Sequence, residues 1–487
     1  MIWLLAAACA LATLPASLRW LRVAQREHYL PPAASQFALR WTASSPVNRL
    51  LDLASVAGLV GAVFDLRWGF LTALAQIGPI GLPVKGVTSP LSWTPRLRRL
   101  ATVVGLILVG AVSTGALIDQ PLMIVAPLLF LPWLIDLTLL VLGPIERRLS
   151  DQWVEKAAAK LKRIGPVVVA ITGSYGKTST KNYVTHLLTG SRAVVASPAS
   201  FNNRMGLARA INEGLTLGTE VFVAEMGTYG PGEIADLCSW MPPKVAAIVA
   251  VGPVHLERFK TLERIVAAKA EILDQAMVGV ICVDDPLLAE LARERAGSME
   301  IIEVSTDDEI HVDGLSVGSA PEGVFAPNLG VAIAICRRLG MDMEVISARV
   351  PSLATPEHRQ SVTKAVSGFA IIDNTFNSNP AGARSALDLL AREGNGGTTA
   401  VITPGMVELG RLQFEENRLF AEVAAARVDH LVIVGRTNRR ALLEGSAGGK
   451  ATVTVVATRE EAVQWAREHL GPGDAVLYEN DLPDHYP

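Results

Sequence analysis

The sequence predicts an α-helical membrane domain followed by two α/β domains. Half of the 487 residues are hydrophobic, and most of the long apolar runs lie before Gly143. From Pro166 onward, β-branched runs alternate with helical stretches, and a second alternating set begins after Pro351. Such alternation is typical of a parallel sheet that helices cover on both faces. We therefore expect a transmembrane domain, a central domain and a Rossmann-like C-terminal domain over residues 1–145, 146–350 and 351–487.

Five apolar runs make up the expected membrane domain: Ile2–Leu18, Leu50–Phe64, Gly69–Val84, Leu100–Ile118 and Pro121–Leu142. The last two are close to the roughly 20 residues that a spanning helix needs. The first run has no basic residue before it and no small-residue cleavage site after it, which favours an uncleaved anchor over a signal peptide. The middle pair is short and fits a tilted helical hairpin or a re-entrant element, so four spans are an alternative to five.

Basic residues indicate how these runs are oriented in the membrane. They gather in three connecting stretches: Arg19–Arg49, Lys85–Arg99 and Arg147–Arg163. Five spans with the N-terminus outside place all three stretches on the cytoplasmic side, as the positive-inside rule requires. We expect a multi-pass protein of the cell membrane, with the lipid bilayer as a partner and both α/β domains in the cytoplasm.

Charge and cysteine content exclude several other classes. The net charge of −3 gives no indication of a nucleic-acid partner. The four cysteines are far apart in the chain, which favours reduced, buried thiols over a metal site or a disulfide framework. The stretch Asp151–Lys162 predicts an amphipathic helix, for which a connecting role is favoured over a place on the membrane surface.

The two α/β domains are expected to contain nine strands and seven helices. Central strands are predicted at Val167–Ile171, Val221–Glu225, Val245–Val251 and Gly279–Val283, with helices at Thr178–Leu188, Met205–Glu213, Glu233–Cys238 and Leu262–Ala276. C-terminal strands are predicted at Phe369–Ile372, Thr399–Ile402, His430–Val434, Thr452–Val456 and Ala475–Leu477, with helices at Ala381–Arg392, Glu415–Ala426 and Arg459–His469.

The first central strand runs into a glycine loop, ITGSYGKTST, which begins at Ile171. Gly173 and Gly176 let the backbone approach phosphate oxygens, and N–H groups of the following helix point at the same anion. Lys177 supplies a cation for the β- and γ-phosphates, and Thr178 supplies a hydroxyl for Mg²⁺. The common P-loop has a glycine where Ile171 stands, so this loop is two residues tighter. The sequence therefore predicts a P-loop-type central ATPase domain that uses ATP and Mg²⁺.

The tighter loop resembles the G-x-x-G-K-[TS]-[ST] loop of the Mur ligase family. Six further stretches resemble motifs of the dipeptide-adding branch of that family and follow in the same order: FNNRMGL, VAEMGTYGPGEIADL, VGPVHLERFKTLERIVAAKAEIL, VDDP, IDNTFNSNP and GMVELG. The resemblance begins at the loop and has no counterpart in the membrane domain. It implies a Mur ligase central domain followed by a Mur ligase C-terminal domain.

The resemblance also implies a set of functional residues. ATP would be bound by Gly173, Ser174, Gly176, Lys177, Thr178, Ser179, Asn328, Arg359 and Asp373. Mg²⁺ would be held by Thr178, Glu225 and His255, and a carbamylated Lys269 would help to position it. Catalytic roles would fall to Lys177, Lys269, His255 and Arg359, while Asn202, Asn203 and Asn377 would lie near the substrate. The chemistry agrees, because Mg²⁺ prefers carboxylate oxygens and a desolvated lysine more readily supplies the unprotonated amine that a carbamate requires.

The implied reaction is ATP-dependent amide formation in envelope synthesis of the peptidoglycan type. ATP would phosphorylate the carboxylate of an envelope precursor, and the amine of an amino acid or dipeptide would displace phosphate from the acyl phosphate. Apolar runs replace the family's UDP-gripping domain, and YENDLPDHYP replaces its K-G-S-R. Pro327, Asn374 and Phe376 also depart from the family pattern. Both substrates are therefore open, and a lipid-linked donor and membrane or ligase partner subunits are hypotheses.

Three alternatives remain at this point. A polyglutamate-type ligase shares the nucleotide site, but the FNNRMGL, EMG and NSNP stretches favour the first interpretation. A membrane transport ATPase is disfavoured because the apolar runs contain almost no charges that would line a pathway. A non-catalytic scaffold is disfavoured by Lys177, Glu225 and Lys269, although the altered C-terminal end is consistent with it.

Overall fold

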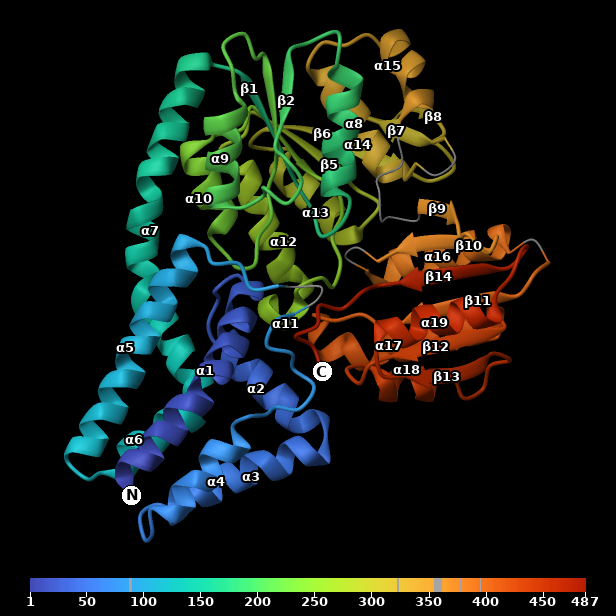
Figure 1. The fold of residues 1–487 in the computed structure, drawn as a ribbon. Coiled ribbons are helices and arrows are strands. Elements are labelled where there is room, and N and C mark those ends of the chain that lie inside the picture. The colour runs from blue at the N-terminus through green and yellow to red at the C-terminus, as the bar shows by residue number, and fades with distance from the viewer. Residues whose placement is uncertain (87–89, 322–323, 354–360, 376–377, 395) are drawn as a thin grey trace.

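The computed structural model describes residues 1–86, 90–321, 324–353, 361–375, 378–394 and 396–487. Figure 1 shows a helical segment at one end of the molecule, joined to a central α/β domain by the long helix α7. A second α/β domain lies beside both of them. The helical segment comprises α1–α7, the central domain runs from β1 to η2, and the C-terminal domain runs from β9 to the chain end.

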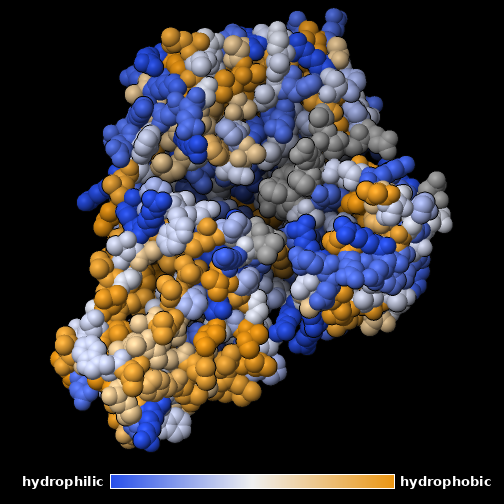
Figure 2. Space-filling view, in the orientation of Figure 1, coloured by the Kyte–Doolittle hydropathy of each residue, from blue (hydrophilic) through white to orange (hydrophobic). Residues whose placement is uncertain are grey.

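The helical segment has one buried core and a broad exposed apolar face. Its helices are α1 (Ile2–Arg26), α2 (Ala33–Ser44), α3 (Pro46–Gly61), α4 (Arg67–Ala75), α5 (Pro95–Leu117), α6 (Pro121–Leu129) and α7 (Leu131–Ile164). Leu5, Leu97 and Leu131 are fully buried in the core. Large apolar side chains on the outer faces of α3, α4 and α5 are exposed, and Figure 2 shows this apolar surface gathered at the end away from the α/β domains.

Fewer helices could cross a membrane than the sequence led us to expect. Among the described residues, α1 and α5 are long and apolar enough, and α6 with α7 would make a third span if this pair, bent by 79°, counts as one. The middle two runs form a hairpin of α3 and α4, with 16 and 9 residues. At about 1.5 Å per residue, neither helix reaches the ~30 Å of a hydrocarbon core. The structure thus provides two or three candidate spans where five were expected.

Helix α7 connects the helical segment to the central domain. It has 34 residues and ends at Ile164, with Gly165 as its C-cap at a φ of 69°. Its last turns place Val154, Ala157 and Leu161 in the core of the central domain. The amphipathic stretch expected at Asp151–Lys162 is therefore the end of one continuous connecting helix.

The central domain is an eight-stranded sheet in the order β2-β3-β1-β4-β5-β6-β7-β8. Its strands are β1 (Val167–Thr172), β2 (Val194–Ala196), β3 (Val221–Glu225), β4 (Val245–Ile248), β5 (Val278–Cys282), β6 (Glu300–Thr306), β7 (Ile310–Val312) and β8 (Leu315–Gly318). Pairing is parallel from β2 through β6 and antiparallel from β6 to β8. Ile171 of β1 pairs with Glu225 of β3, so the glycine loop and Glu225 lie at the same edge.

Helices cover both faces of this sheet. They are α8 (Lys177–Leu188), α9 (Arg204–Gly214), α10 (Glu233–Trp240), α11 (Leu256–Phe259), α12 (Leu262–Ala270), α13 (Pro286–Arg295), α14 (Ala326–Arg338) and α15 (Met343–Arg349), with 3₁₀ turns η1 (Glu271–Leu273) and η2 (Val350–Ser352). Alternate residues of β1 enter separate cores: Val168 and Ala170 on one face, Val169 and Ile171 on the other.

The C-terminal domain is a six-stranded sheet in the order β13-β12-β11-β14-β10-β9. Its strands are β9 (Ser361–Lys364), β10 (Ala370–Asn374), β11 (Thr399–Thr403), β12 (His430–Val434), β13 (Thr452–Val456) and β14 (Ala475–Glu479). Its helices are α16 (Pro380–Glu393), α17 (Gln413–Arg427), α18 (Arg439–Ser446) and α19 (Arg459–His469), with η3 at Gly410–Leu412. All pairs are parallel except β9 with β10.

All nine expected strands are present, with small differences at their ends. Strand β4 stops at Ile248 instead of Val251, and the helix expected over Leu262–Ala276 is α12 followed by a 3₁₀ turn. The sequence patterns did not predict β2, β6 to β9, α11, α13 to α15 or α18. Strand β2 has only three residues and β6 alternates buried with exposed residues, so neither gives the continuous apolar signal of a buried strand.

Candidate active site

The glycine loop joins β1 to the N-terminus of α8, as the sequence predicts. Gly176 has a φ of 78°, a left-handed backbone conformation that residues with a Cβ rarely adopt. A Cβ built on Gly176 would lie 2.1 Å from the Asn328 Oδ1 atom, so the loop is also in close contact with α14. The Lys177 Nζ atom donates to the carbonyl oxygens of Gly173 at 2.7 Å and Ser174 at 3.3 Å. The lysine ammonium therefore lies over the loop backbone.

Glu225 lies beside this loop and is 3% exposed. Its Oε2 atom accepts a hydrogen bond from Thr178 Oγ1 at 2.9 Å, and its Oε1 accepts one from Asn202 Nδ2 at 3.2 Å. Burial raises the pKa of Glu225, but the charges of Lys181 and Lys177 and these hydrogen bonds outweigh burial and hold its pKa below the usual range. Glu225 is therefore an ionised carboxylate next to a hydroxyl, a pair of oxygens that suits Mg²⁺.

Lys181 also lies beside Glu225, and it was not predicted from the sequence as a site residue. Its Nζ atom lies 3.4 Å from Glu225 Oε2, and its side chain is 3% exposed. It follows Lys177 by four residues on α8, so the helical period places both ammonium groups on one face. This spacing is the signal that identifies Lys181.

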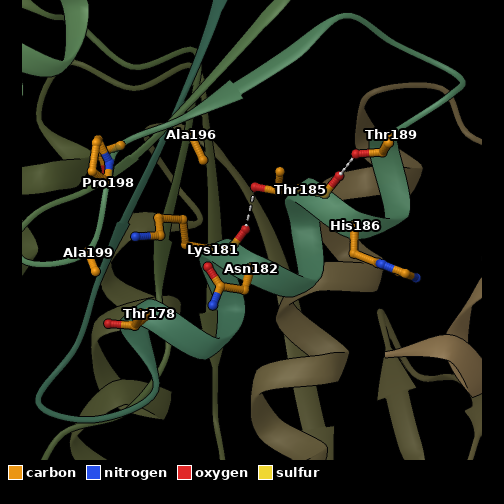
Figure 3. A pocket seen from close by; sticks show the side chains of 10 residues that line it. Thr178, Lys181, Asn182, Thr185, His186, Thr189, Ala196, Pro198 and Ala199 are labelled. Atoms are coloured by element: carbon orange, nitrogen blue, oxygen red, sulfur yellow. Dashed lines mark hydrogen bonds between the residues drawn. The ribbon is translucent and has the colours of Figure 1, made fainter. Parts of the chain in front are cut away.

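A cavity of about 400 Å³ opens beside α8 and the end of β2. Figure 3 shows Thr178 and Lys181 at its lining, with Ala196 and Pro198 opposite. Its lining consists of Thr178, Lys181, Asn182, Thr185, His186, Thr189, Ala196, Ser197, Pro198 and Ala199. The cavity thus adjoins the Thr178–Glu225 pair and has space for part of a ligand.

Lys269 lies on α12 and is 5% exposed. Burial, and to a lesser extent the charge of Lys177, lowers the pKa of Lys269 well below its usual value. A neutral amine is the form that reacts with carbon dioxide to give a carbamate. The environment of Lys269 therefore fits the expected carbamylation.

His255 lies at the junction of the central and C-terminal domains. It has a φ of 57° and precedes the short helix α11. Its Nδ1 atom hydrogen-bonds to the Glu408 carboxylate, which belongs to the GMVELG stretch after β11. Its ring also packs edge-on against Tyr229, with 4.9 Å between ring centroids. Glu408 is thus the hydrogen-bond partner of His255, which the sequence did not predict.

The expected metal ligands are only partly brought together. Thr178 and Glu225 are in contact, whereas the contacts of His255 are to Glu408 and Tyr229. In the part of the chain that the structure describes, no group of three or more His, Cys, Asp or Glu side chains is placed to hold a metal ion. A Mg²⁺ ion that binds with a nucleotide commonly takes one or two protein ligands beside phosphate oxygens and waters, and the Thr178–Glu225 pair fits that pattern.

The two asparagines expected near the substrate differ in their local roles. Asn202 donates to Glu225 and therefore lies beside the Thr178–Glu225 pair. Asn203 is the N-cap of α9, because its Oδ1 accepts from the Gly206 N–H at 3.0 Å. Substrate contact by either residue stays a prediction.

The other expected nucleotide residues lie on several elements. Ser174 exchanges hydrogen bonds with the backbone of Gly252 at 3.1 Å, and Ser179 is buried on α8. Asn328 is buried on α14, and its Oδ1 has no hydrogen-bond partner among the described residues. Asp373 lies one residue before the end of β10, and its Oδ1 accepts a hydrogen bond from the Thr375 hydroxyl at 2.6 Å. Arg359 and Asn377 lie outside the described residues, so their expected roles stay predictions.

A buried carboxyl group in the C-terminal domain was not predicted. Glu479 ends β14, where the sequence departs from the family's K-G-S-R, and it pairs with Asn374 of β10. Its oxygens accept from Asn374 Nδ2 at 2.7 Å and from the Ser378 hydroxyl. Burial raises the pKa of Glu479 to about 7. The sequence showed that this position departs from the family but gave no signal of burial.

Comparison with known proteins agrees with the geometry. A family model described as the Mur ligase middle domain matches residues 171–324, and one described as the Mur ligase, glutamate ligase domain matches residues 358–478. UDP-N-acetylmuramoyl-tripeptide--D-alanyl-D-alanine ligase of Mycobacterium leprae is 31% identical over 376 residues, 66% of this chain and 72% of the relative. The chain belongs to the Mur ligase family. The corresponding ligase of Bacillus subtilis is 26% identical over 347 residues, 66% of this chain and 74% of that relative.

Solved structures show the same Mur ligase fold. MurF from Acinetobacter baumannii has a TM-score of 0.59 and 24% identity, with 68% of this chain and 77% of that chain covered. MurF from Thermotoga maritima in complex with ADP has a TM-score of 0.56 and 25% identity, with 68% and 80% covered. Each of the two comparisons covers about two thirds of this Mur ligase.

Family membership settles the class of reaction. This Mur ligase is an ATP-dependent carbon–nitrogen ligase of the type that forms peptide bonds in peptidoglycan synthesis. The polyglutamate alternative is not favoured, because the relatives that are 31% and 26% identical are named as D-alanyl-D-alanine ligases. Both family models begin after residue 170, so neither of them covers the helical segment.

Proposed function

We propose that this Mur ligase is attached to a membrane by its helical segment and adds a D-alanyl-D-alanine dipeptide to a muramoyl-tripeptide precursor there. The observation that carries the attachment is the apolar surface at the end of the helical segment away from the α/β domains (Figure 2). Leu50, Leu53 and Phe64 on and after α3 are 65%, 65% and 85% exposed. Contiguous apolar surface of this extent marks a membrane or protein interaction site.

The helix ends that bear this surface point away from the ligase domains. In Figure 1, the N-terminus of α1, the end of α5 and the α3–α4 turn lie at one extremity, and the central domain lies at the other. Insertion of that extremity leaves both α/β domains in water. With the basic connecting stretches on the same side as these domains, the positive-inside rule favours the cytoplasm.

The dipeptide acceptor and muramoyl-tripeptide donor are proposed from similarity. The first seven relatives by similarity carry the name UDP-N-acetylmuramoyl-tripeptide--D-alanyl-D-alanine ligase. The helical segment stands where the family has its UDP-gripping domain, so we propose a donor presented at the membrane on a lipid. Partner subunits at the membrane belong to the same proposal.

The chemistry follows from the residues at the glycine loop. Lys177 and the N–H groups of α8 would bind and neutralise the transferred phosphoryl group, because an ammonium group and a helix N-terminus both stabilise the charge that develops on its oxygens. Thr178 and Glu225 would hold Mg²⁺, which supplies additional charge stabilisation at the β- and γ-phosphates. The donor carboxylate attacks the γ-phosphorus and releases ADP; the dipeptide amine then attacks the acyl phosphate carbon, and phosphate leaves as the amide forms. A carbamylated Lys269 is part of this proposal.

Membrane attachment is tested by flotation of the full chain with lipid vesicles. The wild type should float with the vesicles, and L50N/L53N/F64N should lose most of that binding. A matched control, L217N/L315N, changes leucines of the central domain that are 79% and 60% exposed and should float like the wild type. Wild-type protein that stays with the soluble fraction in the presence of vesicles contradicts the attachment.

The donor is tested with two precursors and one acceptor. The full chain in vesicles receives ATP, D-alanyl-D-alanine and muramoyl-tripeptide linked either to UDP or to a lipid carrier, and product masses are measured. We expect a higher kcat/KM with the lipid-linked donor. Equal or higher kcat/KM with the UDP-linked donor overturns the lipid-linked donor but leaves the ligase assignment intact.

A further inference from the structure

A cleft separates the helical segment from the C-terminal domain. It has a volume of about 800 Å³. On the side of the helical segment it is lined by the α2–α3 junction, Ser44 to Val47, and by Ile80. On the other side it is lined by α18 and the residues before it. It is therefore distinct from the glycine loop and the cavity beside α8.

The C-terminal side of the cleft is strongly basic. Arg436, Arg439 and Arg440 line it together with one carboxylate, Glu444, which leaves an excess of positive charge. The Arg439 Nε atom donates to a backbone carbonyl at 2.9 Å, and the Arg440 guanidinium lies 5.5 Å from the Phe414 ring centroid. Among the described residues none of these three arginines forms an ion pair. Their charges are available to an anion in the cleft.

The opposite wall adds the positive end of a helix. Helix α3 begins at Pro46, and Ser45 is its N-cap, with the Ser45 hydroxyl oxygen accepting from the Asn48 N–H. Pro46 has no N–H and the Asn48 N–H is bonded to Ser45, so it is the Val47 N–H and the helix dipole that favour an anion here. Guanidinium groups face this helix end across the cleft, and both kinds of group prefer phosphate oxygens.

The apolar part of the surface starts at the same place. Val47 lines the cleft and is 50% exposed, and exposed Leu50 and Leu53 continue from it along α3. Ile80, which follows the hairpin, is 60% exposed at the cleft. Helix α3 has 16 residues, so its apolar side extends about 24 Å from the cleft toward the hairpin turn. A phosphate at the polar end and a hydrocarbon chain along this side would satisfy both surfaces.

We propose that the cleft binds the phosphate headgroup of an anionic membrane lipid, whose acyl chains lie along the exposed side of α3 and α4. The inference rests on the proposed membrane attachment and adds a headgroup site and a preferred lipid charge. A soluble phosphate would use the arginines but not the apolar side. Bound in this way, the lipid fixes the C-terminal domain against the membrane surface.

The test uses the full chain and two kinds of vesicle, one of phosphatidylcholine alone and one containing phosphatidylglycerol. We expect the wild type to bind the phosphatidylglycerol vesicles about 10- to 100-fold more tightly, from three arginines near an anionic surface. The variant R436Q/R439Q/R440Q should lose this preference while keeping its binding to phosphatidylcholine through the apolar surface. ATP turnover with soluble substrates should be unchanged, because no residue that lines the cleft belongs to the glycine loop or to the cavity beside α8.

A second triple variant controls for net charge. R163Q/R293Q/R337Q removes the same charge from the end of α7, from α13 and from α14, which lie on or beside the central domain, and should keep the wild-type preference. Equal loss in both triple variants overturns the cleft and leaves only a general electrostatic attraction. Thermal unfolding of both variants establishes that they are folded.

Two further outcomes separate the proposals. If the wild type binds both vesicle types equally, the headgroup site is wrong while membrane attachment stands; if it binds neither, both are wrong. A separate measurement of inorganic pyrophosphate binding tests whether the cleft takes a soluble phosphate instead of a lipid. Saturable pyrophosphate binding without lipid that R436Q/R439Q/R440Q abolishes would assign the cleft to a soluble phosphate and overturn the lipid; unchanged binding in this variant agrees with the proposal.

Discussion

Arg22 of α1 forms an ion pair with Asp484, although 462 positions separate them in the chain. Arg22 is fully buried, and the neighbouring His485 accepts a hydrogen bond at its backbone oxygen from Trp41 Nε1 at 2.9 Å. The end of the chain thus packs into the helical segment. Glu27 extends the junction to the central domain, since it pairs with Arg258 at 2.8 Å. All three parts of the molecule therefore meet at one place, next to His255.

Removal of the Asp484 carboxylate should destabilise this junction. D484A leaves the buried Arg22 charge without that partner, and breaking a buried pair costs about 3–5 kcal/mol. Urea unfolding of the full chain in detergent measures the change. The matched control D481A breaks a pair with Arg459, which is 55% exposed, and should cost less than about 1 kcal/mol. Equal effects of the two substitutions on the free energy of unfolding would contradict a structural role for the chain end that packs into the helical segment.

The left-handed backbone of Gly176 predicts that G176A impairs nucleotide binding. A methyl group there would strain the backbone and meet the Asn328 side chain, at a cost of about 1–3 kcal/mol. We expect at least a tenfold loss of ATP affinity in a nucleotide-binding titration. G230A is the control, because a Cβ at Gly230 has no atom within 4 Å. ATP binding by G176A at the affinity of G230A would show that the loop is not the nucleotide site.

Glu225 should determine the Mg²⁺ requirement. E225Q keeps the shape and the hydrogen bond from Thr178 but removes the charge, so turnover should fall by about 100-fold or more and need a higher Mg²⁺ concentration. Phosphate release measured over a Mg²⁺ series tests this expectation. The control E220Q changes an exposed glutamate one residue before β3 and should behave like the wild type. An unaltered Mg²⁺ series in E225Q removes Glu225 from the metal site.

The ligase should be active only when the Lys269 side chain carries a carbamate. K269R cannot form one because its side chain stays protonated, so it should lose activity as fully as K269A. The wild type should lose activity in buffer depleted of carbon dioxide and regain it when bicarbonate is added. A carbamate signal from ¹³C-labelled bicarbonate in the wild type, absent from K269R, is the direct readout. Full activity of K269R would rule out carbamylation as a requirement.

Glu479 should make stability depend on pH between about 4.5 and 7. Its pKa is raised to about 7 in the folded state, so the folded protein holds a proton that the unfolded chain has released. Stability is therefore greatest below the unfolded pKa and falls as pH rises to about 7, by about 3 kcal/mol in total for this buried group. Urea unfolding from pH 5 to 8 should show this slope in the wild type and a smaller one in E479Q. Identical slopes would contradict the burial of a neutral carboxyl group.

The sequence predicted the parts of the site that lie within one element. Gly173, Lys177 and Thr178 lie within one short strand–loop–helix segment, and β-branched runs located nine of the strands, so the local pattern was sufficient for these parts. It did not predict contacts between distant segments, such as His255 with Glu408 or Arg22 with Asp484, because one sequence carries no record of which segments meet. Nor did it predict the number of candidate spans: the run Gly69–Val84 is largely apolar, but its helix ends at Ala75, before Pro79 and Pro83.

The ligation reaction itself is the most direct test of the account. The full chain is incubated with ATP, a muramoyl-tripeptide donor and D-alanyl-D-alanine, and ADP, phosphate and product mass are measured for the wild type and for K177A. The account predicts an amide product in equal amounts with ADP and phosphate, dependent on both donor and acceptor, and none with K177A. Phosphate release that needs neither donor nor acceptor, or no ATP turnover at all, would contradict it.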